Sequence, residues 1–150
     1  MEIAAPEDGE LPGLAAAPAE RRRRARELIE CGALVLRVAR RDGRVLGACS
    51  MYVEVPAGLA NEVGCAPASW RWLQAAHAAL LTNLEVAPPW RGRGIGRALV
   101  SALAVAAAAA GARELAARVT TDAPARGFYS RLGFRRRLGD AAAELWSLPL

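Results

Sequence analysis

The order of apolar and polar residues along the 150-residue chain predicts an alternation of strands and helices. Short apolar runs bounded by glycine, proline or aspartate are typical of strands. Apolar residues three or four positions apart are typical of one helix face, and Ile95, Leu99 and Leu103 follow that spacing. We predict strands over residues 1–5, 33–39, 45–55, 78–86, 114–121, 134–138 and 144–148, and helices over residues 18–31, 95–110 and 124–132.

Turn signals separate these elements. Asp42-Gly43 is typical of the centre of a two-residue hairpin, and Gly139-Asp140 indicates a second turn. Gly47, inside a predicted strand, indicates a bulge. Residues 9–17 are weakly patterned, and residues 56–72 read as a long irregular segment.

The order of these elements predicts an α+β protein with one mixed sheet and helices on its faces. A chain of this length can bury the core of one domain, and no internal repeat or linker divides it. We therefore expect residues 1–150 to form a single domain.

The stretch from Leu84 to Leu99 organises the chain. It reads as the end of a strand, a turn at Pro88-Pro89, a glycine-rich loop and the start of a long helix. The glycines lack Cβ atoms, so a ligand can approach the main chain closely. The first N–H groups of a helix have no internal partner and, with the helix dipole, favour an anion. Because arginines stand among the glycines, we predict a ligand that carries a pyrophosphate.

Two well-known glycine loops do not fit this stretch. The dinucleotide fingerprint G-x-G-x-x-G would need glycine at position 97, and the P-loop needs a lysine, which the chain lacks. The pattern R-x-x-G-x-G does fit from Arg91 to Gly96. With the strand before it and the helix after it, this stretch resembles the acyl-CoA-binding motif of the GNAT superfamily of N-acetyltransferases.

A second stretch strengthens this resemblance. F-Y-x-x-L-G-F, from Phe128 to Phe134, is similar to the other characteristic motif of the superfamily and follows at a suitable distance. Asp122 stands where family members often have asparagine, and its carboxylate can still cap the following helix.

The resemblance implies a mostly antiparallel central sheet that is splayed at its middle, with helices on both faces. It also implies that acetyl-CoA is the acyl donor. The main chain of Leu84 and Val86 would hold the pantetheine arm, and the Val86 N–H would stabilise the oxyanion. The Tyr129 hydroxyl would lie near the thioester sulfur. The residues implied for the pyrophosphate are Arg91, Gly92, Arg93, Gly94, Ile95, Gly96 and Arg97.

The general base is less clearly marked. Glu85 lies on the strand before the loop, where the family often carries an acidic residue, and we expect it to act as the base. Glu62, His77 and a water chain without a dedicated base remain alternatives. Trp70 and Trp72, with Glu62, are candidates for lining a pocket for the acceptor.

Composition bears on the other classes of function. The net charge is +5, and all 20 basic residues are arginine. The run Arg21–Arg24 suggests a nucleic-acid binder, but it lacks interleaved aromatic residues and is typical of a solvated helix face. Three widely spaced cysteines and one histidine show no metal-ligand spacing. No signal peptide or membrane-spanning run is recognisable.

We therefore expect a cytoplasmic N-acetyltransferase, monomeric or homodimeric, that binds acetyl-CoA and a primary amine of a small molecule or protein. We expect no metal, nucleic-acid or membrane partner. Neither Cys49 nor Cys65 has a neighbouring base or cation in the sequence that would activate a thiol, so direct attack in a ternary complex is predicted. The alternative is a GNAT-fold module that binds acyl-CoA without catalysis.

Overall fold

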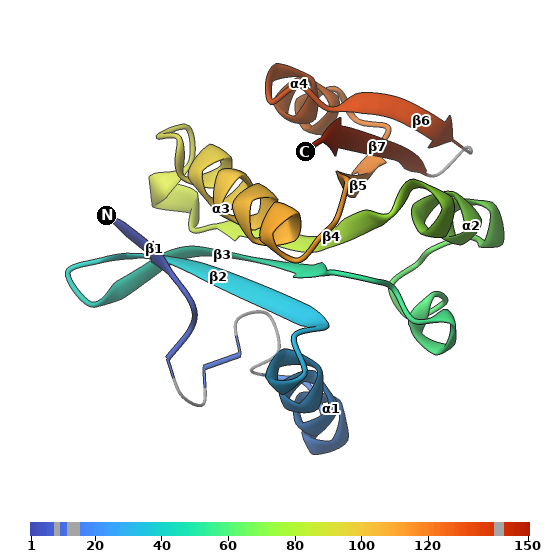
Figure 1. Ribbon diagram of the computed structural model, residues 1–150. Coiled ribbons are helices and arrows are strands. Elements are labelled where there is room, and N and C mark those ends of the chain that lie inside the picture. The colour runs from blue at the N-terminus through green and yellow to red at the C-terminus, as the bar shows by residue number, and fades with distance from the viewer. Residues whose placement is uncertain (8–9, 12–15, 140–142) are drawn as a thin grey trace. The chain divides into compact units, whose positions relative to one another are not determined.

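The computed structural model describes residues 1–7, 10–11, 16–139 and 143–150. Asp140 of the predicted second turn, and parts of the weakly patterned stretch, lie outside these residues. The strands are β1 (Glu2–Ala4), β2 (Leu34–Arg41), β3 (Arg44–Tyr52), β4 (Ala78–Val86), β5 (Glu114–Thr120), β6 (Arg135–Gly139) and β7 (Ala143–Pro149) (Figure 1). The helices are α1 (Ala19–Glu30), α2 (Pro67–Ala76), α3 (Ile95–Ala109) and α4 (Ala123–Arg131), with short 3₁₀ helices η1 (Ala57–Leu59) and η2 (Pro88–Trp90).

The strands form one mixed sheet in the order β1-β2-β3-β4-β5-β7-β6. β4 and β5 run parallel, whereas the β1–β2, β2–β3, β5–β7 and β6–β7 pairs are antiparallel. The predicted α+β class with a mixed, mostly antiparallel sheet is confirmed. Among the described residues, every helix is too short or too polar to span a bilayer.

The chain divides into two compact units, and β4 contributes to both. The first unit contains Met1–Tyr52 and Asn83–Ala106, and the second contains Val53–Thr82 and Ala107–Leu150. The expectation of a single domain over residues 1–150 stays a prediction.

In the first unit, the hairpin of β2 and β3 has the geometry that its sequence predicts. Asp42 and Gly43 both have positive φ angles, of 51° and 74°, as a type I′ turn requires. This turn fixes the register, in which Arg41 pairs with Arg44 and Leu34 with Tyr52. The helix α1 packs on one face of the hairpin, where its Ala25 is buried with Leu34 and Leu36.

The helix α3 covers the other face of the same hairpin. The register passes from Ala39↔Gly47 to Arg40↔Val45, so Leu46 is an extra residue and the predicted bulge is present. A Cβ atom on Gly47 would lie 2.8 Å from the Glu85 carbonyl oxygen and 3.2 Å from Leu99 Cδ1. Gly47 therefore allows the end of β4 and the first turns of α3 to approach β3 closely, which positions the loop between them.

In the second unit, β5 lies between β4 and β7. Ala78 pairs with Glu114, and Leu115 pairs with Leu148. The central residues of β5, from Leu115 to Ala117, are fully buried. The helix α4 contacts β5, and α2 leads directly into β4 through His77, whose φ of 50° gives a left-handed helix end.

The expectation of an irregular segment over residues 56–72 is wrong for residues 67–72, which are helical. The structure has η1 and α2 there, and β3 ends at Tyr52 rather than at Val55. Pro67 occupies the first turn of α2, where its missing N–H costs nothing, and Leu73 is the buried anchor of the helix. The Trp70 indole and the Gln74 amide donate to the Val55 carbonyl, which ties the preceding segment to the helix.

Candidate active site

The glycine-rich loop between β4 and α3 has the backbone that its sequence predicts. Gly92 and Gly94 have φ angles of 74° and 84°, in the left-handed region that favours glycine. A Cβ atom at either position would meet no other atom within 4 Å. The loop therefore needs these glycines for its conformation, and both residues stay open to an approaching ligand.

The main-chain donors of this loop have no acceptor among the residues that the structure describes. The first hydrogen bond of α3 runs from the Ala98 N–H to the Gly94 carbonyl oxygen, at 3.0 Å. In the described part of the chain, the backbone N–H groups from Gly92 to Arg97 donate no hydrogen bond. They lie at the N-terminus of a 15-residue helix, where the helix dipole favours an anion. Gly96 is the second residue of α3 and is half-buried.

The arginines of the loop are exposed. Arg91 Nε donates to the Val86 carbonyl oxygen at 3.0 Å, so it lies back against the end of β4. Arg93 stacks on Trp90, with its guanidinium carbon 4.9 Å from the ring centroid. No ion pair joins Arg91, Arg93 or Arg97 to a carboxylate of the described residues. Their charge is therefore available to an anionic ligand.

The end of β4 offers both an apolar and a polar side. Leu84 and Val86 are half-buried, whereas Glu85 between them is exposed, as the alternation of a strand requires. The Ala87 N–H donates to the Leu46 carbonyl oxygen at 2.8 Å, which fixes the start of the loop next to the bulge. These residues belong to the first unit, together with the loop.

Tyr129 belongs to the second unit and lies on α4. The Asp122 carboxylate accepts a hydrogen bond from the Ala125 N–H at 3.0 Å and so caps this helix, as predicted. Tyr129 is 8% exposed. Its ring packs edge-on against Phe128 and Phe134, with centroids 5.1 and 5.2 Å away. The Tyr129 ring is therefore part of the packing between α4 and the residues that follow it.

Sequence reasoning missed a buried carboxylate behind α4. Glu144 on β7 accepts hydrogen bonds from Arg126 Nη2 at 2.6 Å and Arg126 Nε at 2.9 Å, and it pairs with Arg136 on β6. Burial acts to raise the pKa of Glu144, but the two guanidinium groups outweigh it and hold the pKa below its ordinary value. Because Glu144 is 18 residues from Arg126, no local pattern could reveal this pair.

The remaining candidates are spread over the second unit. His77 is exposed and ends α2, and its carbonyl oxygen accepts from the Arg113 N–H. Glu62 is exposed, and Trp70 and Trp72 are half-buried on α2. The Trp70 N–H is already used on Val55, so this indole serves the fold of the segment.

The cysteines and acidic residues do not form a reactive or metal-binding cluster in the structure as described. Burial raises the pKa of the Cys49 thiol to about 12 and also raises that of Cys65. No group of three or more histidine, cysteine, aspartate or glutamate residues among the described positions could hold a metal ion.

Comparison with known proteins identifies the family of this loop and fold. The model of the acetyltransferase (GNAT) family matches residues 10–134. The chain belongs to the GNAT acetyltransferase family. Members of this family are acyl-CoA N-acyltransferases, so the predicted enzyme class is confirmed. No curated protein shows significant sequence similarity to the chain.

Solved structures of GNAT proteins share the fold. A ribosomal-protein-alanine N-acetyltransferase from Brucella melitensis is 22% identical, aligns over 100% of both chains and has a TM-score of 0.72. The PaiA N-acetyltransferase from Thermoplasma acidophilum, solved in complex with coenzyme A, is 15% identical over 87% of this chain and 70% of its own, with a TM-score of 0.66. Nourseothricin acetyltransferase is 26% identical over 79% of this chain and 66% of its own, with a TM-score of 0.59.

Proposed function

We propose that this protein transfers the acetyl group of acetyl-CoA to a primary amine of a small molecule or a protein, by direct attack in a ternary complex. The observation that supports this most strongly is the loop from Arg91 to Arg97. Its N–H groups have no acceptor within the described residues, and its arginines have no carboxylate partner there. A diphosphate supplies both the missing acceptors and the missing negative charge.

In the proposed reaction, a different group of the protein acts on the carbonyl oxygen, on the leaving sulfur and on the amine. The amine nitrogen attacks the thioester carbonyl carbon, and the Val86 N–H stabilises the negative charge that develops on the carbonyl oxygen. The carbon–sulfur bond then breaks, and the Tyr129 hydroxyl gives its proton to the leaving thiolate. The exposed Glu85 takes the proton that the amine loses, directly or through water.

The state of the cysteines supports direct transfer rather than an acyl-enzyme. A thiol must ionise to attack a thioester, and the raised pKa of Cys49 and Cys65 disfavours the thiolate. Cys31 is exposed and its thiol donates to the Leu28 carbonyl oxygen; no cation or base among the described residues is hydrogen-bonded to its sulfur.

The test is an assay of free thiol released from acetyl-CoA in the presence of a panel of amines, amino acids and peptides with free N-termini. We expect thiol release that depends on one class of amine, with mass spectrometry showing an acetyl group on its nitrogen. Binding of coenzyme A without acetylation of any acceptor in the panel would instead favour a non-catalytic acyl-CoA-binding module. A cysteine-bound acetyl group during turnover would contradict direct attack.

A further inference from the structure

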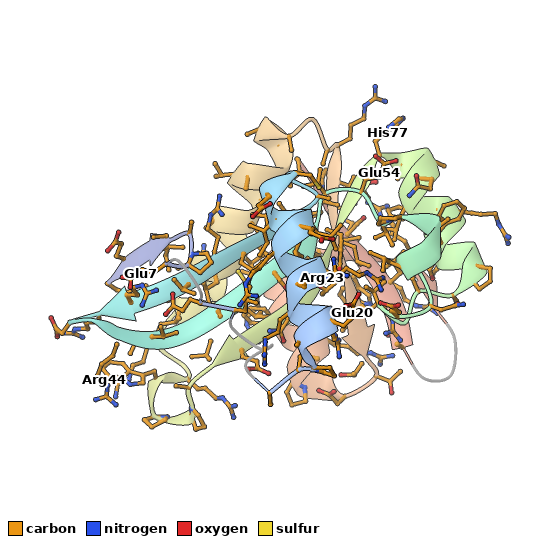
Figure 2. All side chains as sticks on the ribbon, turned by 90° about the horizontal axis from the view of Figure 1, so that it is seen from below. Glu7, Glu20, Arg23, Arg44, Glu54 and His77 are labelled. Atoms are coloured by element: carbon orange, nitrogen blue, oxygen red, sulfur yellow. The ribbon has the colours of Figure 1, made fainter. Side chains whose placement is uncertain are left out.

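The tip of the β2–β3 hairpin carries an unfavourable pair of charges. Arg41 and Arg44 face each other directly across the two strands, in the register that the Asp42-Gly43 turn fixes. Like charges at directly opposed positions destabilise a strand pair. The only carboxylate near Arg41 within the described residues is Asp42, at 3.9 Å and 92% exposed, which offsets little of this repulsion. Arg44 extends from the hairpin end into solvent (Figure 2).

Arg40, the neighbour of Arg41 on β2, is an arginine that does have carboxylate partners. The Arg40 guanidinium pairs with Glu10 and lies 3.9 Å from Glu7, and its side chain is 13% exposed. Arg44 has no such partner within the described residues, and Arg41 is 58% exposed. The two arginines at the tip are thus cations without an adequate counter-charge.

Trp90 connects Arg41 of this pair to the glycine-rich loop. The Arg41 guanidinium carbon lies 5.9 Å from the centroid of the Trp90 ring, and that of Arg93 lies 4.9 Å from the same centroid. Cation–π contacts of this length hold guanidinium groups against an indole. Arg41 of the hairpin tip and Arg93 of the loop, which are far apart in the sequence, therefore lie around one aromatic ring.

We propose that Arg41 and Arg44, with Arg93, form a second phosphate site that binds the 3′-phosphate of the ribose of coenzyme A. This inference rests on the proposed function, in which the loop holds the diphosphate of the same molecule. A phosphate monoester carries close to two negative charges near neutral pH and has three acceptor oxygens, which matches a cluster of guanidinium groups.

The arrangement favours this phosphate over the other parts of the donor. The unused N–H groups lie between Gly92 and Arg97, so a diphosphate is bound there without the hairpin. The Trp90 ring lies beside two guanidinium groups, and their positive charge favours an anionic group over the neutral adenine at this place. What the hairpin adds is charge alone, next to the loop, and the remaining charged group of coenzyme A is the 3′-phosphate.

The test compares the calorimetric Kd of coenzyme A with that of 3′-dephospho-coenzyme A, which needs no knowledge of the amine acceptor. We expect the wild-type protein to bind coenzyme A about tenfold more tightly, the value of one charge-assisted contact. The double substitution Arg41→Gln/Arg44→Gln should weaken coenzyme A by about tenfold and leave the Kd of the dephospho form unchanged. Trp90→Leu keeps every charge and should reduce the discrimination about threefold.

A matched control separates local contacts from loss of net charge. Arg21→Gln/Arg26→Gln removes two exposed arginines from α1 in the same unit and should preserve the tenfold discrimination. Equal wild-type affinity for the two nucleotides would overturn the 3′-phosphate site while leaving the proposed function intact. An equal loss for both nucleotides in the hairpin variant would assign these arginines to the diphosphate instead. Failure of the wild-type protein to bind either nucleotide would overturn the proposed function and this inference together.

Discussion

The glycine-rich loop of the first unit and the surroundings of α4 in the second unit differ in whether their polar groups have partners within the protein. In the loop of the first unit, the main-chain donors from Gly92 to Arg97 have no acceptor, and the arginines have no carboxylate partner, among the described residues. Behind α4 in the second unit, Glu144 is buried against Arg126 and Arg136. A region whose charges satisfy each other is complete as it folds, whereas a region that leaves donors unused is suited to a ligand that completes it.

The same contrast separates two sets of arginines on the surface. Arg23 on α1 lies between Glu20 and Glu27, at 2.5 and 2.8 Å, and these carboxylates raise its pKa. Figure 2 shows Glu20 and Arg23 on this helix. Arg23 of the α1 arginine run is thus paired with carboxylates of its own helix, unlike the loop arginines.

The largest expected effect is on kcat and concerns Tyr129 on α4. Tyr129→Phe keeps the edge-on contacts with Phe128 and Phe134 but removes the hydroxyl. We expect kcat to fall roughly 10²-fold or more, because proton transfer to the thiolate is lost, with the Kd of coenzyme A unchanged. Steady-state kinetics and calorimetry check this.

Tyr52→Phe is the matched control, since Tyr52 is a half-buried tyrosine that packs on the cluster of α1 and β2. It should leave kcat as it is. A Tyr129→Phe enzyme with wild-type kcat would remove Tyr129 from the mechanism and leave it as a packing residue.

The next largest effect concerns the glycine-rich loop and the Kd of coenzyme A. Gly94→Ala forces a side chain into a left-handed conformation, at about 1–2 kcal/mol, although the space around it is open. We expect the Kd of coenzyme A to rise about tenfold, because binding must then restore a strained loop. Gly111→Ala imposes the same kind of strain after α3, where φ is 91°, and should leave the Kd unchanged. Equal Kd values for all three proteins would mean that the loop conformation is irrelevant to binding.

Gly47→Ala tests whether close packing positions the loop. The new Cβ would lie 2.8 Å from the Glu85 carbonyl oxygen, a backbone atom that cannot move aside easily. We expect a loss of about 1–3 kcal/mol of stability, a fall of several degrees in Tm, and weaker binding of coenzyme A. Gly58→Ala, where the space is open, is the control and should change neither property. An unaltered Tm for Gly47→Ala would refute the close approach.

The smallest expected effect concerns the loss of stability at low pH that Glu144 and its arginine partners cause. The pKa of Glu144 is lowered, so the stability it contributes is fully present above its ordinary value of 4.5 and is lost as pH falls through the folded value. Glu144→Gln should lower Tm by a few degrees at pH 7 and weaken the decline of Tm below about pH 4.5. Glu20→Gln, in an exposed pair, should do neither. The same acid slope in wild type and Glu144→Gln would show that this pairing does not matter to stability.

Local signals explain which parts of the fold could be predicted. The strand over residues 78–86, the Asp42-Gly43 hairpin, the start of α3 and the Asp122 cap depend on neighbouring residues, and each was predictable. The helix α2 was missed although its sequence carries usable signals: Pro67 stands in its first turn, and Trp70 and Leu73 are three positions apart, on one helix face.

The rest depends on contacts that span the sequence. The pairing of Glu144 with Arg126 and the stacking of Arg41 on Trp90 join residues that no spacing rule connects. For the same reason, the sequence motif identified the loop and Tyr129 but gave no indication of the hairpin tip as a neighbour of the loop.

The central claim is that the main-chain N–H groups from Gly92 to Arg97 hold the diphosphate of acetyl-CoA, and amide NMR tests it most directly. Coenzyme A would be titrated into ¹⁵N-labelled protein while each backbone N–H is followed. We predict that the amides of Gly92, Gly94, Ile95 and Gly96 show the largest saturable shifts, moving downfield as they gain an anionic acceptor. Saturable binding that leaves these four amides unshifted would contradict the account.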